Sequence, residues 1–229
     1  MSSRTDILTA LGAKPDPDAA DRLRTKAGPG DPSAGFLAMD DWDLFAANLE
    51  EAGGHFLAAA DTAEAKKILA GLIREIGAET SVAHRHPLLD RIGLAGVLDS
   101  AGVSLDIIED RYEKASTSRE ALASADLGVT SADALLAESG SIALAAGPGQ
   151  ARGVSLLPPV HLAVAGPGSM LADITGLPAL IRRLSEESGR PPSAVHLITG
   201  PSSTADIEQT LVRGIHGPMK LYVLAVKSI

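Results

Sequence analysis

Cysteine is absent from this chain of 229 residues. The chain therefore cannot form a disulfide, use a thiolate nucleophile, or hold zinc or an iron–sulfur cluster through cysteine. Aromatic residues make up only 3% of the sequence, too few for the stacking platforms of many single-strand binders. Any redox chemistry that involves this protein must therefore use a bound organic cofactor or a partner chain.

Positive charge is also scarce. The chain has 20 Lys and Arg against 29 Asp and Glu, a net charge of −9, and no cluster of basic residues. Because a nucleic-acid surface normally needs a basic stripe, the sequence argues against nucleic acid as a partner. No window of about 20 residues is continuously apolar, and the first ten residues lack the apolar core of a signal peptide. We expect a cytoplasmic protein without a membrane span.

The hydrophobic content, 45%, suffices for one large domain, or for one domain with an appendage. The first fifty residues are rich in Pro, Gly and Asp up to an amphipathic helix at 40–52, which ends at Gly53. The sequence therefore predicts an N-terminal helical arm at 1–52 and an α/β domain at 53–229.

Strand and helix patterns alternate through the second part of the chain. Strands are expected at 55–60, 80–84, 103–108, 127–130, 141–146, 160–165, 195–198 and 220–226. Helices are expected at 62–76, 88–100, 118–123, 132–136, 178–187 and from 204 onward. This alternation predicts an α/β fold with a mostly parallel sheet and helices on both faces.

One segment breaks this alternation. Between residues 139 and 172 the only formal charge is Arg152, and Gly and Pro recur throughout. Two apolar strands joined in this way indicate an antiparallel hairpin or a crossover beside the parallel sheet. The spacing of Gly147, Gly149 and Gly153 is not that of a dinucleotide fingerprint, so an NAD site of the Rossmann type is disfavoured.

The turn after the strand at 195–198 is a candidate anion site. Gly200 ends that strand, and Ser203 is a plausible N-cap for a following helix. The backbone N–H groups of Ser202, Ser203 and Thr204 would then converge at a helix N-terminus, at the carboxyl end of a strand. The alternative is a capped helix that binds nothing.

Two charged residues could carry chemistry. Glu138 precedes an apolar strand, where a carboxylate with a raised pKa could act as a nucleophile or base; the alternative is an exposed loop residue. Arg152, with Gln150 nearby, could grip a carboxylate or phosphate through two hydrogen bonds. Its alternative is a surface arginine lying over apolar neighbours.

The histidines also have either a functional or a structural interpretation. His161, at the start of a strand, could be a general base or a core residue with one hydrogen bond. His216 lies between glycines that would let the backbone approach a ligand, or it belongs to a simple turn. His84 and His86 could be half of a metal site, but no matching carboxylates lie nearby in the sequence, so no metal is expected. His196 is interpreted as a structural residue at a strand edge.

Three long motifs now carry a family resemblance: GVTSADALLAESGSIAL (128–144), GPGQARGVSLLPPVHLAV (147–164) and ITGPSSTADIEQTLVRGIHGP (198–218). Together they resemble the lactate-utilisation protein C family, the LUD-domain proteins. The helix sequence WDLFAANLEEAGG (42–54) is similar to a helix near the start of that family's domain. The resemblance extends from about Trp42 to the end of the chain.

The resemblance implies a fold of the sugar-phosphate isomerase and CoA-transferase type. It also implies a role in oxidising L-lactate to pyruvate, as the cluster-free subunit of a complex whose partner subunits hold the iron–sulfur clusters. The absence of cysteine fits this division, and no cofactor is expected in this chain. Ser203 and Met219 stand where the family often has arginine, so two cations are missing beside the candidate anion site.

Two functional interpretations stay open. The chain could be an auxiliary subunit that binds partner chains and a small carboxylate or phosphate. It could instead be an acyl-CoA transferase-like enzyme, with Glu138 as nucleophile and the backbone N–H groups of Gly147 and Gly149 as oxyanion hole. The candidate ligand-binding residues are Gly147, Gly149, Gln150, Arg152, His161, Gly200, Ser202, Ser203, Thr204 and His216.

Overall fold

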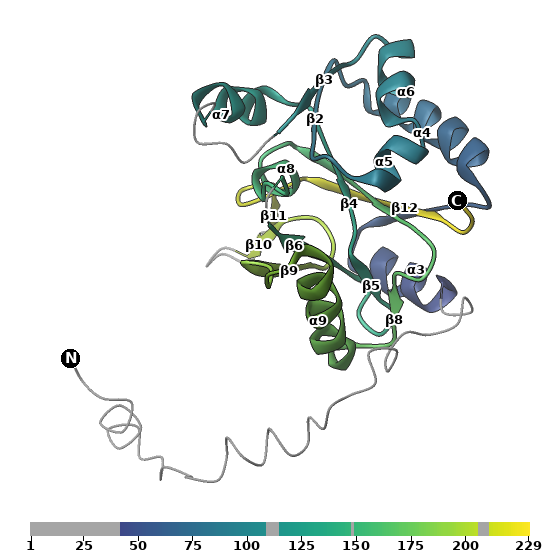
Figure 1. The fold of residues 1–229 in the computed structure, drawn as a ribbon. Helices are drawn as coiled ribbons and strands as arrows, with labels where there is room; N and C mark the ends of the chain where they lie inside the picture. Colours follow the sequence, from purple (N-terminus) through teal and green to yellow (C-terminus); the bar gives the residue numbers. More distant parts are fainter. Residues whose placement is uncertain (1–41, 109–114, 148, 206–210) are drawn as a thin grey trace, which may run out of the picture. The chain divides into compact units, whose positions relative to one another are not determined.

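Six parallel strands form the central sheet of the computed structural model, which describes residues 42–108, 115–147, 149–205 and 211–229 (Figure 1). Their order is β1 (His55–Ala59), β12 (Lys220–Val226), β7 (Val160–Ala165), β4 (Leu127–Ser131), β2 (Thr80–Ala83) and β3 (Ser104–Ile107). The predicted α/β fold with a mostly parallel sheet is confirmed. Its central strands β12, β7 and β4 are buried almost throughout, so the sheet needs cover on both faces.

Helices cover both faces of this sheet, as predicted. On one face lie α4 (Thr62–Ile76), α5 (Pro87–Arg91) and α6 (Leu94–Ser100), which share an apolar core with alternate residues of the central strands (Figure 1). On the other face lie α3 (Trp42–Glu51), α7 (Ala115–Ser124) and α8 (Gly153–Leu156). Of the helices in the described residues, none is long and apolar enough to cross a membrane.

A second sheet packs beside α3 on the same side of the central sheet. Its order is β8 (Met170–Leu171), β5 (Ala134–Leu136), β6 (Ser141–Ala146) and β9 (Ala194–Ile198), with β6 antiparallel to both neighbours. Leu135 and Ile142 face the core beneath the central sheet. The opposite face packs on α9 (Leu177–Ser188), which follows the short 3-10 helix η3 (Ile174–Gly176). The segment from β6 through α8 to β7 is therefore a crossover between two sheets.

Helix α4 shows why local sequence suffices for some elements. The Asp61 side chain accepts hydrogen bonds from the N–H groups of Ala63 and Glu64, and Gly77 ends the helix in the left-handed conformation. Its buried face presents Leu69 and Ile73 to the core. The observed bounds are those predicted from the sequence.

Three predicted helices differ from the structure. Residues 132–136 were expected to be helical but contain β5, because pairing with β6 and β8 buries this short apolar run completely. The single helix expected at 88–100 is two, since Gly93 adopts φ +64° between α5 and α6. The helix expected from Thr204 is also wrong: β10 (Ser203–Ala205) pairs antiparallel with β11 (Leu211–Arg213).

Helix α3, placed by the sequence analysis in the N-terminal arm, packs into the core of the α/β unit. Its Trp42, Phe45 and Leu49 side chains are buried against strands of both sheets. A Cβ atom at Gly140 would overlap the backbone of Leu49, so the turn between β5 and β6 lies directly on this helix. The Asn48 side chain closes the same contact by donating to two carbonyls of that turn.

Candidate functional site

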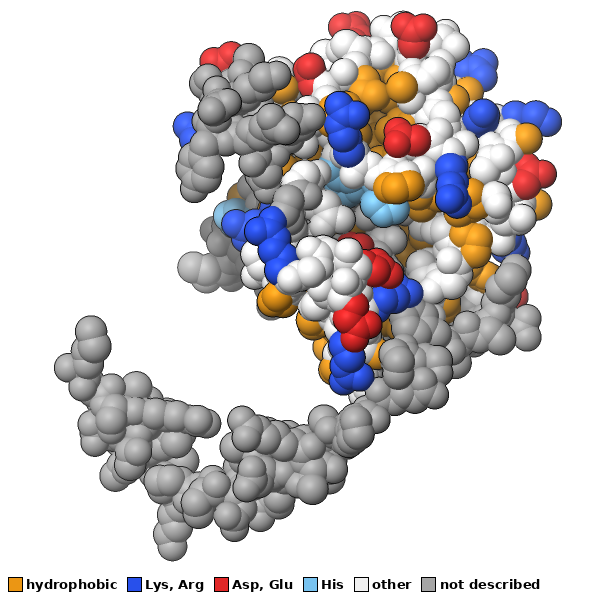
Figure 2. Space-filling view, in the orientation of Figure 1, with side chains coloured by type: hydrophobic (Ala, Val, Ile, Leu, Met, Phe, Trp, Pro, Cys, Tyr) orange, Lys and Arg blue, Asp and Glu red, His pale blue; other side chains and the backbone are white. Residues whose placement is uncertain are grey.

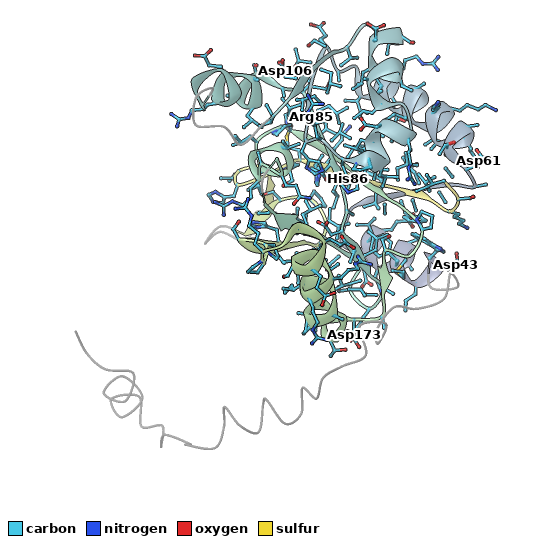
Figure 3. All side chains as sticks on the ribbon, in the orientation of Figure 1. Asp43, Asp61, Arg85, His86, Asp106 and Asp173 are labelled. Atoms are coloured by element: carbon cyan, nitrogen blue, oxygen red, sulfur yellow. The ribbon has the colours of Figure 1, made fainter. Side chains whose placement is uncertain are left out.

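A small pocket opens where β2 and β4 of the central sheet end. His84 follows the last residue of β2, and Thr130 and Ser131 are the last two residues of β4. The carboxyl ends of parallel strands are the usual ligand-binding edge of an open α/β sheet. Figure 3 labels His86, two residues beyond His84, near the middle of the view, where Figure 2 shows exposed histidine surface.

The opposite wall comes from the second sheet and the segment leading into α8. The complete lining is His84, Thr130, Ser131, Leu144, Ala145, Ala146, Gln150, Ala151, Arg152, Ser155 and His196. The pocket is narrow, because only about 20 Å³ of it admits the centre of a water-sized sphere, which is room for about one water molecule. A nucleotide or a CoA ester does not fit this space, so the pocket as it stands is compatible only with a very small ligand.

His84 is bonded to the end of β4. Its Nε2 atom accepts the backbone N–H of Ser131 at 3.1 Å and lies 3.1 Å from the Ser131 hydroxyl. Because Nε2 accepts this N–H, the hydrogen of the neutral ring belongs on Nδ1. Burial, and next the charge of nearby His86, lower the pKa of His84 to about 4. The imidazole is therefore neutral at physiological pH.

A second hydroxyl–imidazole pair lies beside the first. The Thr130 hydroxyl lies 2.9 Å from Nε2 of His161, which is fully buried in β7. Burial, and next the charge of His84, lower the pKa of His161 to about 3. The position therefore matches the core alternative for His161: it supports a residue of the pocket and does not itself line it.

Arg152 and Gln150 bring polar side chains to the pocket from the turn before α8. The Gln150 N–H donates to the carbonyl of Gly147 at 3.0 Å, and Gly149 has φ +75°, so the two glycines shape this turn. The Arg152 side chain is exposed, and its carbonyl accepts the hydroxyl of Ser155 at 3.1 Å. Of the candidate ligand-binding residues from the sequence, the pocket therefore contains Gln150 and Arg152.

His196 reaches the pocket from β9, opposite Leu144 of β6 in the antiparallel register. Its Nε2 atom is buried and has no hydrogen-bond partner among the residues that the structure describes. A buried polar atom without a partner costs free energy unless a ligand or water satisfies it.

Gly147 and Gly149 belong to the turn before α8 and do not line the pocket, and the remaining candidate residues lie in a separate pair of loops. The Ser202 N–H donates to the carbonyl of Pro218 at 2.9 Å, and the Gly214 N–H donates to the carbonyl of Ser202 at 3.1 Å. Since Ser202 uses its N–H in this way, and Ser203 begins a strand, the expected helix N-terminus is absent. The loops that hold Gly200, Ser202, Ser203 and His216 thus meet each other but do not line the pocket; the side chain of Thr204 lies outside the described residues.

Glu138 is exposed and lies at the other end of β6 from Gly147. Six residues of strand separate the two ends by about 20 Å. Hydroxyl–hydroxyl hydrogen bonds between Ser139 and Ser141 and between Ser141 and Thr199 place the Glu138 turn near the Gly200 loop instead. The geometry does not support acyl transfer from Glu138 toward an oxyanion hole at residues 147–149.

Sequence reasoning missed His84, Thr130, Ser131, Ser155 and His196 as pocket residues. A signal existed for the first three, because polar residues end two strands that were predicted to be parallel. His196 gave no such signal, since its place depends on the register of the second sheet. Among the described residues, no group of three or more His, Asp or Glu side chains could hold a metal ion.

Comparison with known proteins defines the class. A family model described as the LUD domain matches residues 42–226, which contain both sheets and the pocket, so the chain belongs to the LUD domain family. A solved structure of a DUF162 family protein from Deinococcus radiodurans shares the fold, with a TM-score of 0.54 and 19% identity. The match covers 83% of this chain and 99% of that one.

Particular relatives carry the name lactate utilization protein C. The protein of that name from Shouchella clausii is 38% identical over 150 residues, which are 66% of this chain and 63% of that protein. The one from Geobacillus sp. (strain WCH70) is 33% identical over 166 residues, 71% of this chain and 68% of that protein. The matched region thus spans about two thirds of these relatives' length.

Proposed function

We propose that this chain serves lactate utilisation and that its pocket binds a small carboxylate such as L-lactate or pyruvate. The class of function comes from the relatives named lactate utilization protein C. The observation that carries the ligand class is the pocket itself, because Arg152 lines it and the other residues of its lining are uncharged. Arginine is suited to a carboxylate because its planar fork can donate two parallel hydrogen bonds.

The proposal assigns electron transfer to other chains. Oxidation of L-lactate to pyruvate releases two electrons, and the sequence holds no cysteine to ligate an iron–sulfur cluster. We therefore propose that this chain is the cluster-free subunit of a complex with iron–sulfur partners. In that complex its residues would bind and orient the acid while the partners carry the electrons.

A thermal-shift titration with L-lactate, pyruvate and inorganic phosphate tests the binding proposal. A ligand that binds only the folded state stabilises it by roughly 2.7 kcal/mol at one hundred times its Kd. In Arg152→Ala the stabilisation by either carboxylate should vanish. The unfolding midpoint without ligand should hardly change, because this side chain is exposed.

The outcomes separate clearly. Equal stabilisation of Arg152→Ala and the unaltered protein by L-lactate would refute a carboxylate site at this arginine. Stabilisation by phosphate alone would replace the carboxylate with a phosphate ligand. A large loss of stability in ligand-free Arg152→Ala would show that the arginine is structural.

The role in lactate utilisation has its own test. Deleting the gene should abolish growth of the host on L-lactate and leave growth on glucose unchanged. Affinity capture of the tagged protein from lactate-grown cells should bring down chains that contain iron and acid-labile sulfide. Normal growth of the deletion strain on L-lactate would overturn the physiological proposal, whatever the pocket binds.

A further inference from the structure

The polar side chains that line the pocket differ in whether they already have a hydrogen-bond partner within the protein. The Ser131 and Thr130 hydroxyls are each paired with an imidazole, and the Ser155 hydroxyl donates to the Arg152 carbonyl. His196 differs, because its buried Nε2 atom has no partner in the described part of the chain. His196 is therefore a pocket residue with a buried nitrogen whose hydrogen-bonding capacity is unused.

We propose that His196 bonds the hydroxyl group of the bound acid and thereby makes the pocket selective for 2-hydroxy acids. This inference rests on the proposed carboxylate site. Arg152 and His196 line the same small pocket, so one small ligand bound there lies beside both residues. In a 2-hydroxy acid the hydroxyl is on the carbon next to the carboxylate, the shortest spacing that offers two polar ends.

The chemistry of the hydroxyl explains the selectivity. A hydroxyl both donates and accepts, so it can pair with Nε2 in either tautomer of the imidazole. A 2-oxo acid can only accept, and therefore requires the tautomer with hydrogen on Nε2. An acid with a methylene group at this position leaves Nε2 buried and unpaired, so of the three kinds of acid it loses the most binding free energy.

Isothermal titration with L-lactate and propionate isolates this contact. The two acids share a three-carbon skeleton and differ in the 2-hydroxyl, and both are ionised at neutral pH. One additional hydrogen bond, from the 2-hydroxyl group to His196, predicts about tenfold tighter binding of L-lactate than of propionate. His196→Leu should reduce this ratio to about one, whereas His196→Gln, which keeps a polar amide near Nε2, should retain part of it.

His55→Gln is the matched control, because His55 is exposed on β1, at the far edge of the central sheet from β2 and β3. This variant should show the unaltered ratio. Folding of each variant is checked by the fluorescence of Trp42, the one tryptophan of the chain, which is buried.

Each result has a definite meaning. Equal affinity of the unaltered protein for both acids, with both weakened in Arg152→Ala, overturns the role of His196 but leaves the carboxylate site standing. An undiminished preference for L-lactate in His196→Leu also overturns it. If neither L-lactate nor propionate binds the unaltered protein, the proposed ligand class and this inference fall together.

Discussion

Replacing Asp133 by Asn should stabilise the fold at pH 8 and change little at pH 4. Asp133 lies between β4 and β5, where its carboxylate accepts the N–H of Ala145 at 2.7 Å. Burial raises the pKa of Asp133 to about 6, against opposing contributions from that hydrogen bond and from Arg183. The Glu187 charge adds to the increase. Asn keeps an oxygen that can accept the Ala145 N–H but carries no charge.

The direction of the pKa change determines at which pH Asp133 destabilises the folded state. Because the pKa is higher in the folded state than its ordinary value of 3.8, the protonated side chain favours folding. That contribution is complete below about pH 4 and is lost as the pH rises through about 6. A difference of roughly two pKa units corresponds to at most about 3 kcal/mol, so the variant should gain on the order of 1 to 3 kcal/mol at pH 8.

Urea unfolding followed by Trp42 fluorescence, repeated between pH 4 and 8, measures this difference. Asp126→Asn is a control of opposite sign. Hydrogen bonds from the backbone N–H of Glu79, and from the N–H and hydroxyl of Thr80, lower the pKa of Asp126. The free energy of unfolding of Asp126→Asn should be about 1 to 3 kcal/mol lower than that of the unaltered protein at pH 7, with a smaller difference at pH 4. A uniform loss of stability in Asp133→Asn at every pH would refute the burial argument and show that Arg183 compensates the charge.

Three further substitutions test the packing and a helix cap. Gly128→Ala should lower the free energy of unfolding by about 3 kcal/mol or more, because the added Cβ atom would overlap the Val154 carbonyl oxygen. Gly71→Ala should raise the free energy of unfolding by about 0.5 to 1 kcal/mol, because Gly71 lies in helix α4 with open space around it. Equal midpoints of urea unfolding for these two alanine variants would contradict the close contact between β4 and α8. Asp61→Ala should lower the free energy of unfolding by about 1 kcal/mol in the same assay, because two backbone N–H groups of α4 lose their acceptor. An unchanged free energy of unfolding would mean that water replaces the cap.

Local signals explain which parts of the fold were predictable. Helix α4 carries its own start at Asp61 and its own stop at Gly77, so the sequence specifies it without reference to the rest of the molecule. Strands β5 and β10 are different, because each is three residues long and is defined by its pairing with a neighbouring strand. Short apolar or polar runs of this kind fit a helix as well as a strand until the partner is known.

The residues of the site likewise include some that local sequence predicts and some that depend on strand pairing. Arg152 could be predicted because it is the only charge in a long uncharged segment, and the pocket does contain it. The anion site expected near Ser203 rested on a rule for parallel sheets, but the preceding strand, β9, is antiparallel to its neighbour β6. His196 belongs to the pocket through that same antiparallel pairing with Leu144, which no local pattern encodes.

The position of β12 between β1 and β7 bears on how the protein is made. Strand β1 is the first of the central sheet to leave the ribosome, yet the strand it pairs with, β12, is the last. Until β12 has been synthesised, β1 and α4 have no sheet to join, and the apolar edge of β7 stays open. A nascent chain must therefore keep these surfaces from aggregating through most of translation. A stop codon just before Lys220 would leave β1 separated from the rest of its sheet rather than merely shorten it.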